Sequence, residues 1–220
     1  PAEVDVDRML LSADPPPSVD DSDVTAALEM LSGASLPLLL AGGGVAVSGS
    51  SERLTAFAER LQVPVATTGN GRGVMSETHP LSLGRVGFGG GNLVADKALE
   101  KADALLCVGC GISDMTTYEY TLPVGASDIM VVDISGQQAP QAPAARIVRC
   151  DAGEFLARAL EKHAAPAPPR PAWEEILAGP RATWQGMLAA SLERREGRPA
   201  GAKVARALAN RLGDDAIVCV

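Results

Sequence analysis

Short runs of apolar residues alternate along the chain with longer segments in which apolar and polar positions are mixed. In the segment 50–61, apolar side chains recur at positions i, i+3, i+4 and i+7, which is typical of a helix with one buried face: Leu54, Phe57, Ala58 and Leu61. Further helices are predicted over 24–34, 92–102 and 152–162. The continuous apolar runs predict strands over 36–41, 63–68, 104–109, 129–134 and 146–150.

The starts of two predicted helices carry capping residues. Asp23 is a candidate N-cap for the helix 24–34. Asp151 and Glu154 have the spacing of a capping box, in which each side chain bonds a backbone amide of the first turn, so the helix is expected to begin at residue 152.

The predicted strands are mostly continuous apolar runs and do not alternate apolar with polar residues. Such runs indicate a parallel sheet that is covered by helices on both faces. We therefore predict an α/β fold: a doubly wound, mostly parallel six-stranded sheet of Rossmann-like, FAD/NAD-binding-type topology. A helical C-terminal extension follows it.

The composition divides the chain into four parts. Residues 1–23 are acidic and rich in proline, and we expect them to be the end of a preceding domain and a linker. Residues 24–163 form the sheet domain, and AAPAPPRPA (164–172) is a stiff linker. Residues 173–220 are expected to hold helices, one broken at Gly179-Pro180 and another over 200–212, and then the start of a truncated C-terminal domain.

Charge and composition exclude several classes of partner. The 220 residues carry a formal charge of −8, and only 3% of them are aromatic, so we expect no nucleic-acid partner. No apolar run approaches the roughly 20 residues of a membrane helix, so no membrane partner is expected. The four cysteines do not form a disulfide framework, which favours the reducing cytoplasm.

A glycine cluster, AGGGVAVSGSSE (41–52), stands between the first predicted strand and its helix. It fails as a GxGxxG dinucleotide fingerprint because Val47 occupies the third glycine position. It fails as a P-loop because Ser50 replaces the phosphate-binding lysine. The small residues alone would also explain the cluster, since they let a strand turn tightly into a helix.

Four more loops of this kind follow predicted strands or precede helices: GNGRG (69–73), GFGGG (87–91), VGCG (108–111) and VVDIS (131–135). In a parallel sheet, the loops after the strands share the carboxyl edge, where ligands bind. The pattern favours a site for an extended, phosphate-bearing ligand. Asp133 either accepts hydrogen bonds from a ribose or adenine, or caps the following turn, and both interpretations remain open.

Four segments taken in order resemble the central domain of thiamine-diphosphate-dependent enzymes: LLLAGGGV, RLQVPVATTGNGRGVMSETHPLSLG, ADALLCVGCGISD and IMVVDIS. That family includes acetolactate synthase and 2-oxo acid decarboxylases, and the resemblance covers residues 24–163. It implies a parent enzyme that uses thiamine diphosphate and Mg²⁺ on a 2-oxo acid. It also implies flanking pyrimidine- and pyrophosphate-binding domains as partners, and a homodimer or homotetramer.

The resemblance places the chemistry outside this chain. The family's activating glutamate belongs to the N-terminal domain, and its GDG…N motif belongs to the C-terminal domain. Here Gly213-Asp214 is followed by Asp215. We therefore expect no catalytic and no metal-binding residue, and an inactive fragment with a scaffolding role. The alternative is a stand-alone nucleotide-binding module, like NAD-dependent deacetylases or electron-transfer flavoproteins, although no histidine is placed to act as a deacetylation base.

The resemblance also implies a set of nucleotide-contacting residues in the glycine loops: Gly43, Gly44, Thr68, Gly69, Asn70, Gly89, Gly90, Gly91, Gly109, Gly111, Asp114 and Asp133. The family's synthases bind FAD there, and oxalyl-CoA decarboxylase binds ADP. Flavin synthases carry R-F-D-D-R where this chain has GISDM (111–115), so both arginines are missing. Since arginine binds phosphate with two parallel hydrogen bonds, we expect the site to be empty or only weakly occupied by FAD or ADP.

Two further patterns are assigned to packing. Cys107 and Cys110 form a CxxC motif, but Cys107 lies within a predicted buried strand, which favours core packing over a redox pair. Trp173 and Trp184 follow the linker and are expected to be packing anchors.

Overall fold

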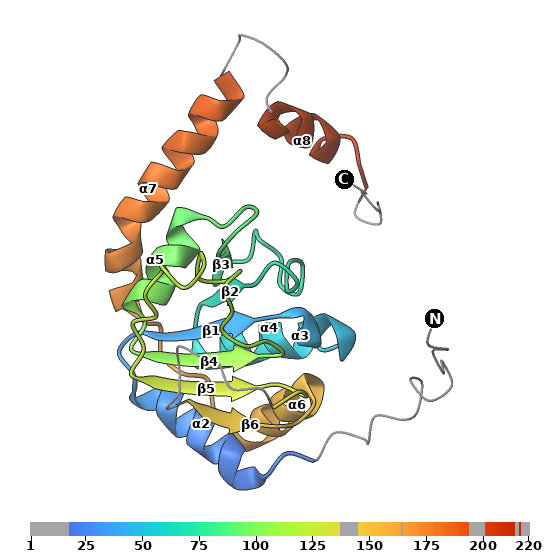
Figure 1. Ribbon diagram of the computed structural model, residues 1–220, viewed down its shortest axis with the longest axis vertical. Helices are drawn as coiled ribbons and strands as arrows, with labels where there is room; N and C mark the ends of the chain where they lie inside the picture. The colour runs from blue at the N-terminus through green and yellow to red at the C-terminus, as the bar shows by residue number, and fades with distance from the viewer. Residues whose placement is uncertain (1–17, 137–144, 164, 194–200, 214–215, 217–220) are drawn as a thin grey trace, which may run out of the picture.

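The computed structural model describes residues 18–136, 145–163, 165–193, 201–213 and 216. Its six strands form one parallel sheet in the order β3-β2-β1-β4-β5-β6 (Figure 1). The strands are β1 (Pro37–Ala41), β2 (Val65–Thr67), β3 (Ser82–Arg85), β4 (Ala104–Val108), β5 (Asp128–Val132) and β6 (Arg146–Val148). The predicted doubly wound α/β fold is confirmed.

Helices cover both faces of the sheet. One face packs against α2 (Asp21–Gly33), α4 (Ser51–Leu61) and α6 (Ala152–Lys162). The other face packs against α5 (Leu93–Lys101) and the start of α7 (Pro171–Glu193). Every residue of β1 is buried, and successive side chains enter opposite layers: Leu39 joins the first and Leu38 and Leu40 join the second. Burial on both faces explains why these strands are continuous apolar runs.

The direction of winding reverses between β1 and β4. From β1 the chain adds β2 and then β3 on one side, and from β4 it adds β5 and β6 on the other. The two central strands pair along their full length, with Ala41 opposite Val108 at their carboxyl ends. A crevice at such a switch point is where sheets of this type bind ligands.

Two elements lie beside the glycine-rich loops. The sixth strand, β3, is the sequence SLGR (82–85), where no strand was located from the sequence. The cluster after β1 turns directly into a short helix, α3 (Gly43–Val47), before α4 begins. The end of β3 and the start of α3 both lie at the carboxyl edge of the sheet.

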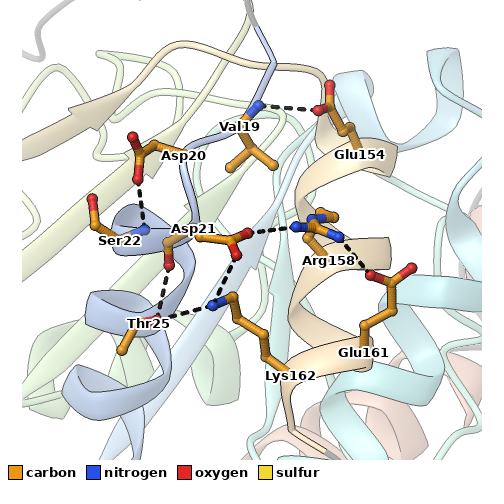
Figure 2. Close-up of polar contacts among 9 residues, drawn as sticks. All are labelled: Val19, Asp20, Asp21, Ser22, Thr25, Glu154, Arg158, Glu161 and Lys162. Atoms are coloured by element: carbon orange, nitrogen blue, oxygen red, sulfur yellow. Dashed lines mark hydrogen bonds and ion pairs between the residues drawn. The ribbon is translucent and has the colours of Figure 1, made fainter.

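The N-cap of α2 is Asp20, whose side chain accepts a hydrogen bond from the Ser22 amide, so the prediction of Asp23 was wrong. Asp23 instead lies in the first turn, where it pairs with Arg146 of β6. The N-cap of α6 is Asp151, as predicted, and it accepts from the amides of Gly153 and Glu154. The Glu154 carboxylate, predicted to complete a capping box with Asp151, instead accepts from the Val19 amide and so ties the segment before α2 to α6 (Figure 2).

Ion pairs also join α2 to α6, next to this hydrogen bond. Figure 2 shows the Asp21 carboxylate between two cations of α6, with 2.7 Å to Arg158 and 3.2 Å to Lys162. Arg158 also reaches Glu161, one turn further along its own helix, at 2.9 Å. The network is exposed, and its main effect is to fix how α2 lies against α6 rather than to add much free energy.

The C-terminal helices are attached to the domain by the start of α7. Trp173 and Leu177 are buried, which confirms Trp173 as a packing anchor, whereas Trp184 is only partly buried. The predicted break at Gly179-Pro180 was wrong, because α7 continues through Pro180. The turn before the proline is held in place by the packing of Trp173 and Leu177, so tertiary contacts outweigh the lost hydrogen bond.

The helix α8 (Gly201–Ala209) follows α7 and has no buried residue among those described. The N-terminal segment 1–17 and the final residues 217–220, which were assigned to neighbouring domains, lie outside the described residues. None of the helices in the described part of the chain combines the length and the apolar character that a membrane span needs.

Candidate functional site

A cavity of about 690 Å³ opens at the carboxyl edge of the sheet. The loops after β1, β2, β3 and β4 form its walls, so the predicted convergence of these loops on one edge is confirmed. Seven of the residues predicted to contact a nucleotide line it: Gly43, Gly44, Thr68, Gly69, Asn70, Gly109 and Gly111.

Five predicted residues do not line the cavity: Gly89, Gly90, Gly91, Asp114 and Asp133. The Asp133 carboxylate accepts from the amide and hydroxyl of Ser135, so it caps the turn after β5, one of the two roles considered from the sequence. Asp114 accepts from the next amide along the chain. The three glycines build the loop behind the wall, where the Gly91 amide donates to the carbonyl of Gly87.

The loops after β1 and β4 are in direct backbone contact. The Gly44 amide donates to the Gly109 carbonyl at 2.9 Å, and the Gly109 amide donates to Val132 of β5 at 2.8 Å. Gly109 has φ +64, in the left-handed region, and a Cβ there would lie 2.6 Å from the Val45 nitrogen. Only glycine meets both conditions without strain, so the close approach of the two loops depends on it.

Two aromatic side chains line the cavity, which the sequence did not predict. Phe88 and Tyr120 line it, and the Phe88 ring meets Tyr118 edge to face at 5.0 Å between centroids. Tyr118, Glu119 and Tyr120 all have positive φ, at 50, 54 and 67. Three consecutive non-glycine residues in this region are costly, so the surrounding contacts must hold the turn in place.

A side-chain hydrogen bond to α5 helps to hold this turn. The Tyr118 hydroxyl donates to Asp96 at 2.7 Å, and the other carboxylate oxygen of Asp96 accepts from the Gly87 amide at 3.2 Å. Burial raises the pKa of Asp96 above its ordinary value of 3.8, although both hydrogen bonds act to lower it. Burial, followed by the bond to Asp96, raises the pKa of Tyr118 to about 12.

The raised pKa of Asp96 predicts a pH-dependent stability. The folded chain holds this proton more tightly than the unfolded chain, so the stabilisation is complete below pH 3.8 and is lost as the pH rises through the folded-state pKa. Asp96→Asn mimics the protonated carboxyl and should remove this dependence. We therefore expect the wild type to lose stability relative to Asp96→Asn as the pH increases from 4 to 8, measured by urea unfolding.

The control for this measurement is Asp128→Asn, at the exposed start of β5. Its stability relative to the wild type should change far less over the same pH range. If the stabilities of the wild type and of Asp96→Asn change in parallel with pH, the raised pKa of Asp96 is contradicted.

Arg85, the last residue of β3, also lines the cavity and was missed from the sequence. One of its terminal nitrogens donates to the Gly89 carbonyl at 2.6 Å, and its Nε is buried with no hydrogen-bond partner in the described structure. The sequence did offer one signal for Arg85: it stands two residues before Gly87, where the predicted glycine loop 87–91 begins. The remaining lining residues outside the predicted set are small, hydroxyl-bearing or apolar: Cys110, Ile112, Ser113, Met115 and Thr116.

The CxxC motif spans the sheet and the cavity wall. Cys107 is buried in β4, and Cys110 is a half-buried free thiol that donates to the Leu40 carbonyl. The hydrogen bond with Cys107, and then burial, raise the pKa of Cys110, so its reactive thiolate form is disfavoured. This agrees with packing and not with a redox pair.

The comparisons with known proteins agree with this architecture. A family model described as the thiamine pyrophosphate enzyme central domain matches residues 24–159, more than half of the chain. The chain belongs to this family. Membership favours the central-domain interpretation over that of a stand-alone nucleotide-binding module.

Curated relatives contain this thiamine pyrophosphate enzyme domain within much longer chains. A probable acetolactate synthase large subunit from Methanococcus aeolicus is 34% identical over 139 residues, which is 60% of this chain and 23% of that protein. One from Methanocaldococcus jannaschii is 38% identical over 111 residues, 50% of this chain and 19% of that protein. The 3D-(3,5/4)-trihydroxycyclohexane-1,2-dione hydrolase of Geobacillus thermodenitrificans is 34% identical over 139 residues, which is 62% of this chain and 21% of that protein. The chain thus spans about a fifth to a quarter of these relatives.

The described residues of this thiamine pyrophosphate enzyme domain do not fit a Mg²⁺–diphosphate site. Within the described ranges, no group of three or more His, Cys, Asp or Glu side chains could hold a metal ion. The cavity at the carboxyl edge instead offers glycine backbone and, in Arg85, a guanidinium whose Nε has no hydrogen-bond partner in the described structure.

Proposed function

We propose that the chain serves as the central domain of a thiamine-diphosphate-dependent enzyme that acts on a 2-oxo acid, as an acetolactate synthase-like carboligase or a decarboxylase. The observation that carries the proposal is the family match over residues 24–159. The names of the two archaeal relatives support the carboligase assignment.

In this proposal the domain is a scaffold. The flanking pyrimidine- and pyrophosphate-binding domains would supply thiamine diphosphate, Mg²⁺ and the catalytic groups, and the whole protein would work as a homodimer or homotetramer in the cytoplasm. The continuous hydrophobic layers on both sheet faces suit this role, because they give the domain a rigid core of its own.

The test uses the protein of which this sequence forms the central domain, purified with and without thiamine diphosphate and Mg²⁺. We expect it to consume pyruvate or another 2-oxo acid with release of CO₂, and to stop when either cofactor is removed. The 220-residue chain assayed alone should give no turnover under the same conditions. Turnover by the isolated chain, or cofactor-independent turnover by the whole protein, would contradict the proposal.

A further inference from the structure

One segment at the carboxyl edge is attached to the rest of the chain by few contacts. Residues 113–122, here called the strap, lie between β4 and β5 and supply four residues to the cavity lining: Ser113, Met115, Thr116 and Tyr120. Most hydrogen bonds of the strap join its own residues, such as the bond from the Glu119 amide to the Asp114 carbonyl at 2.8 Å. In the described part of the chain, two hydrogen bonds join the strap to other segments.

Both of these bonds lead to the loop after β3 and to α5. The Phe88 amide donates to the Met115 carbonyl at 2.9 Å. The Tyr118 hydroxyl donates to Asp96 of α5 at 2.7 Å, and the Tyr118 ring meets Phe88 edge to face. The same carboxylate accepts from the Gly87 amide. Among the described residues, Tyr118 is thus the one strap side chain that forms a hydrogen bond with another segment.

The backbone at this contact is strained. Tyr118, Glu119 and Tyr120 have φ values of 50, 54 and 67, and each such residue costs free energy because its Cβ crowds the backbone. None of the three is glycine or asparagine, the residues that adopt this conformation most readily. Contacts with other segments must therefore offset the strain. A hydrogen bond to a carboxylate is well suited to this, since it is stronger than one between neutral groups.

We propose that the strap controls access to the cavity, and that the hydrogen bond between Tyr118 and Asp96 is the latch that holds it closed. With the bond formed, the left-handed turn keeps Tyr120 at the cavity. With the bond broken, the turn relaxes to ordinary backbone conformations and the cavity widens. The strain favours the open arrangement and the latch favours the closed one, so a change at Asp96 shifts the balance between them. The inference concerns the movement of the strap and does not depend on the reaction proposed for the whole protein.

Cys110 provides a probe of this movement. It lines the same cavity as the strap residues and is a half-buried free thiol, whereas Cys107 and Cys150 are buried. The hydrogen bond with Cys107, and then burial, raise the pKa of the Cys110 thiol, and the charge of Asp96 does not contribute. A change in the alkylation rate of Cys110 therefore reports access to the cavity and not a direct electrostatic effect of the latch.

Alkylation of the 220-residue chain with iodoacetamide tests the proposal, with the rate at each cysteine followed by mass spectrometry of peptide fragments. Tyr118→Phe keeps the ring and removes the latch. In this variant Cys110 should react about ten- to a hundredfold faster than in the wild type, which corresponds to the loss of one hydrogen bond to a charged group. Cys150 belongs to the hydrophobic layer on the α2–α4–α6 face of the sheet, and its rate should not change, because the rest of the fold stays closed.

The matched control is Tyr120→Phe, which removes the other tyrosine hydroxyl of the strap and leaves the latch intact. Its Cys110 should react at the wild-type rate. Asp96→Ala removes the latch from the other side and should also accelerate Cys110, and adding Tyr118→Phe to it should bring no further increase. Four results would each overturn the proposal: equal Cys110 rates in the wild type and Tyr118→Phe, the same acceleration in Tyr120→Phe, additive effects in the double variant, or a Cys150 rate that rises together with that of Cys110.

Discussion

Replacing Gly109 by alanine is expected to destabilise the folded chain by about 2–5 kcal/mol. Two effects act together at this position. The backbone has φ +64, which alanine adopts only with strain, and the new Cβ would lie 2.6 Å from the Val45 nitrogen and 2.7 Å from the Gly44 Cα. Because the obstructing atoms are backbone, they move only if α3 and the end of β1 move. Urea unfolding followed by circular dichroism measures the loss.

Gly111→Ala is the control, with the same substitution two residues further along the same loop. No atom lies within 4 Å of a Cβ placed there, and its φ is outside the left-handed region. The control should change the free energy of unfolding by less than about 0.5 kcal/mol. If both variants are equally stable, the contact between the loops after β1 and β4 does not constrain the fold as described.

The fold was predictable because the burial of its central strands requires a residue pattern that is visible in the sequence. A parallel strand buried on both faces must be apolar throughout, and β1 and β4 are such runs. The edge strand β3 was not located because SLGR (82–85) pairs with β2 alone and is only half apolar. Its place in the sheet is fixed by the parallel pairing to Val65–Thr67, which is a tertiary contact and leaves no local pattern.

The site was predictable in its backbone and not in its side chains. Glycine loops at strand ends can be read from the sequence, and parallel strands bring them together, which placed Gly43, Gly69 and Gly109 in the lining of one cavity. Arg85 went unnoticed because it belongs to the strand that was not located. Tyr120 reaches the wall through a left-handed turn held by Asp96, and no propensity of the residues themselves predicts such a turn.

The same dependence on long-range contacts applies to the attachment of α7, and it leads to the second prediction. Trp173→Ala should destabilise the chain by about 3–5 kcal/mol, as expected for the loss of a buried aromatic residue. Trp173 is 4% exposed, and its indole nitrogen donates to the Pro37 carbonyl at 3.0 Å, at the start of β1. The substitution removes the packing and leaves that carbonyl without its donor.

Trp184→Ala is the matched control, because Trp184 lies on the same helix and only partly enters the same hydrophobic layer. It should cost about 1 kcal/mol. Trp173→Phe separates the packing from the hydrogen bond, since it keeps most of the packing and loses only the indole hydrogen bond. Its loss in free energy of unfolding should lie between those of the two alanine variants. If Trp173→Ala unfolds at the same urea concentration as Trp184→Ala, α7 is not anchored to β1 through Trp173, and the attachment must lie elsewhere along the helix.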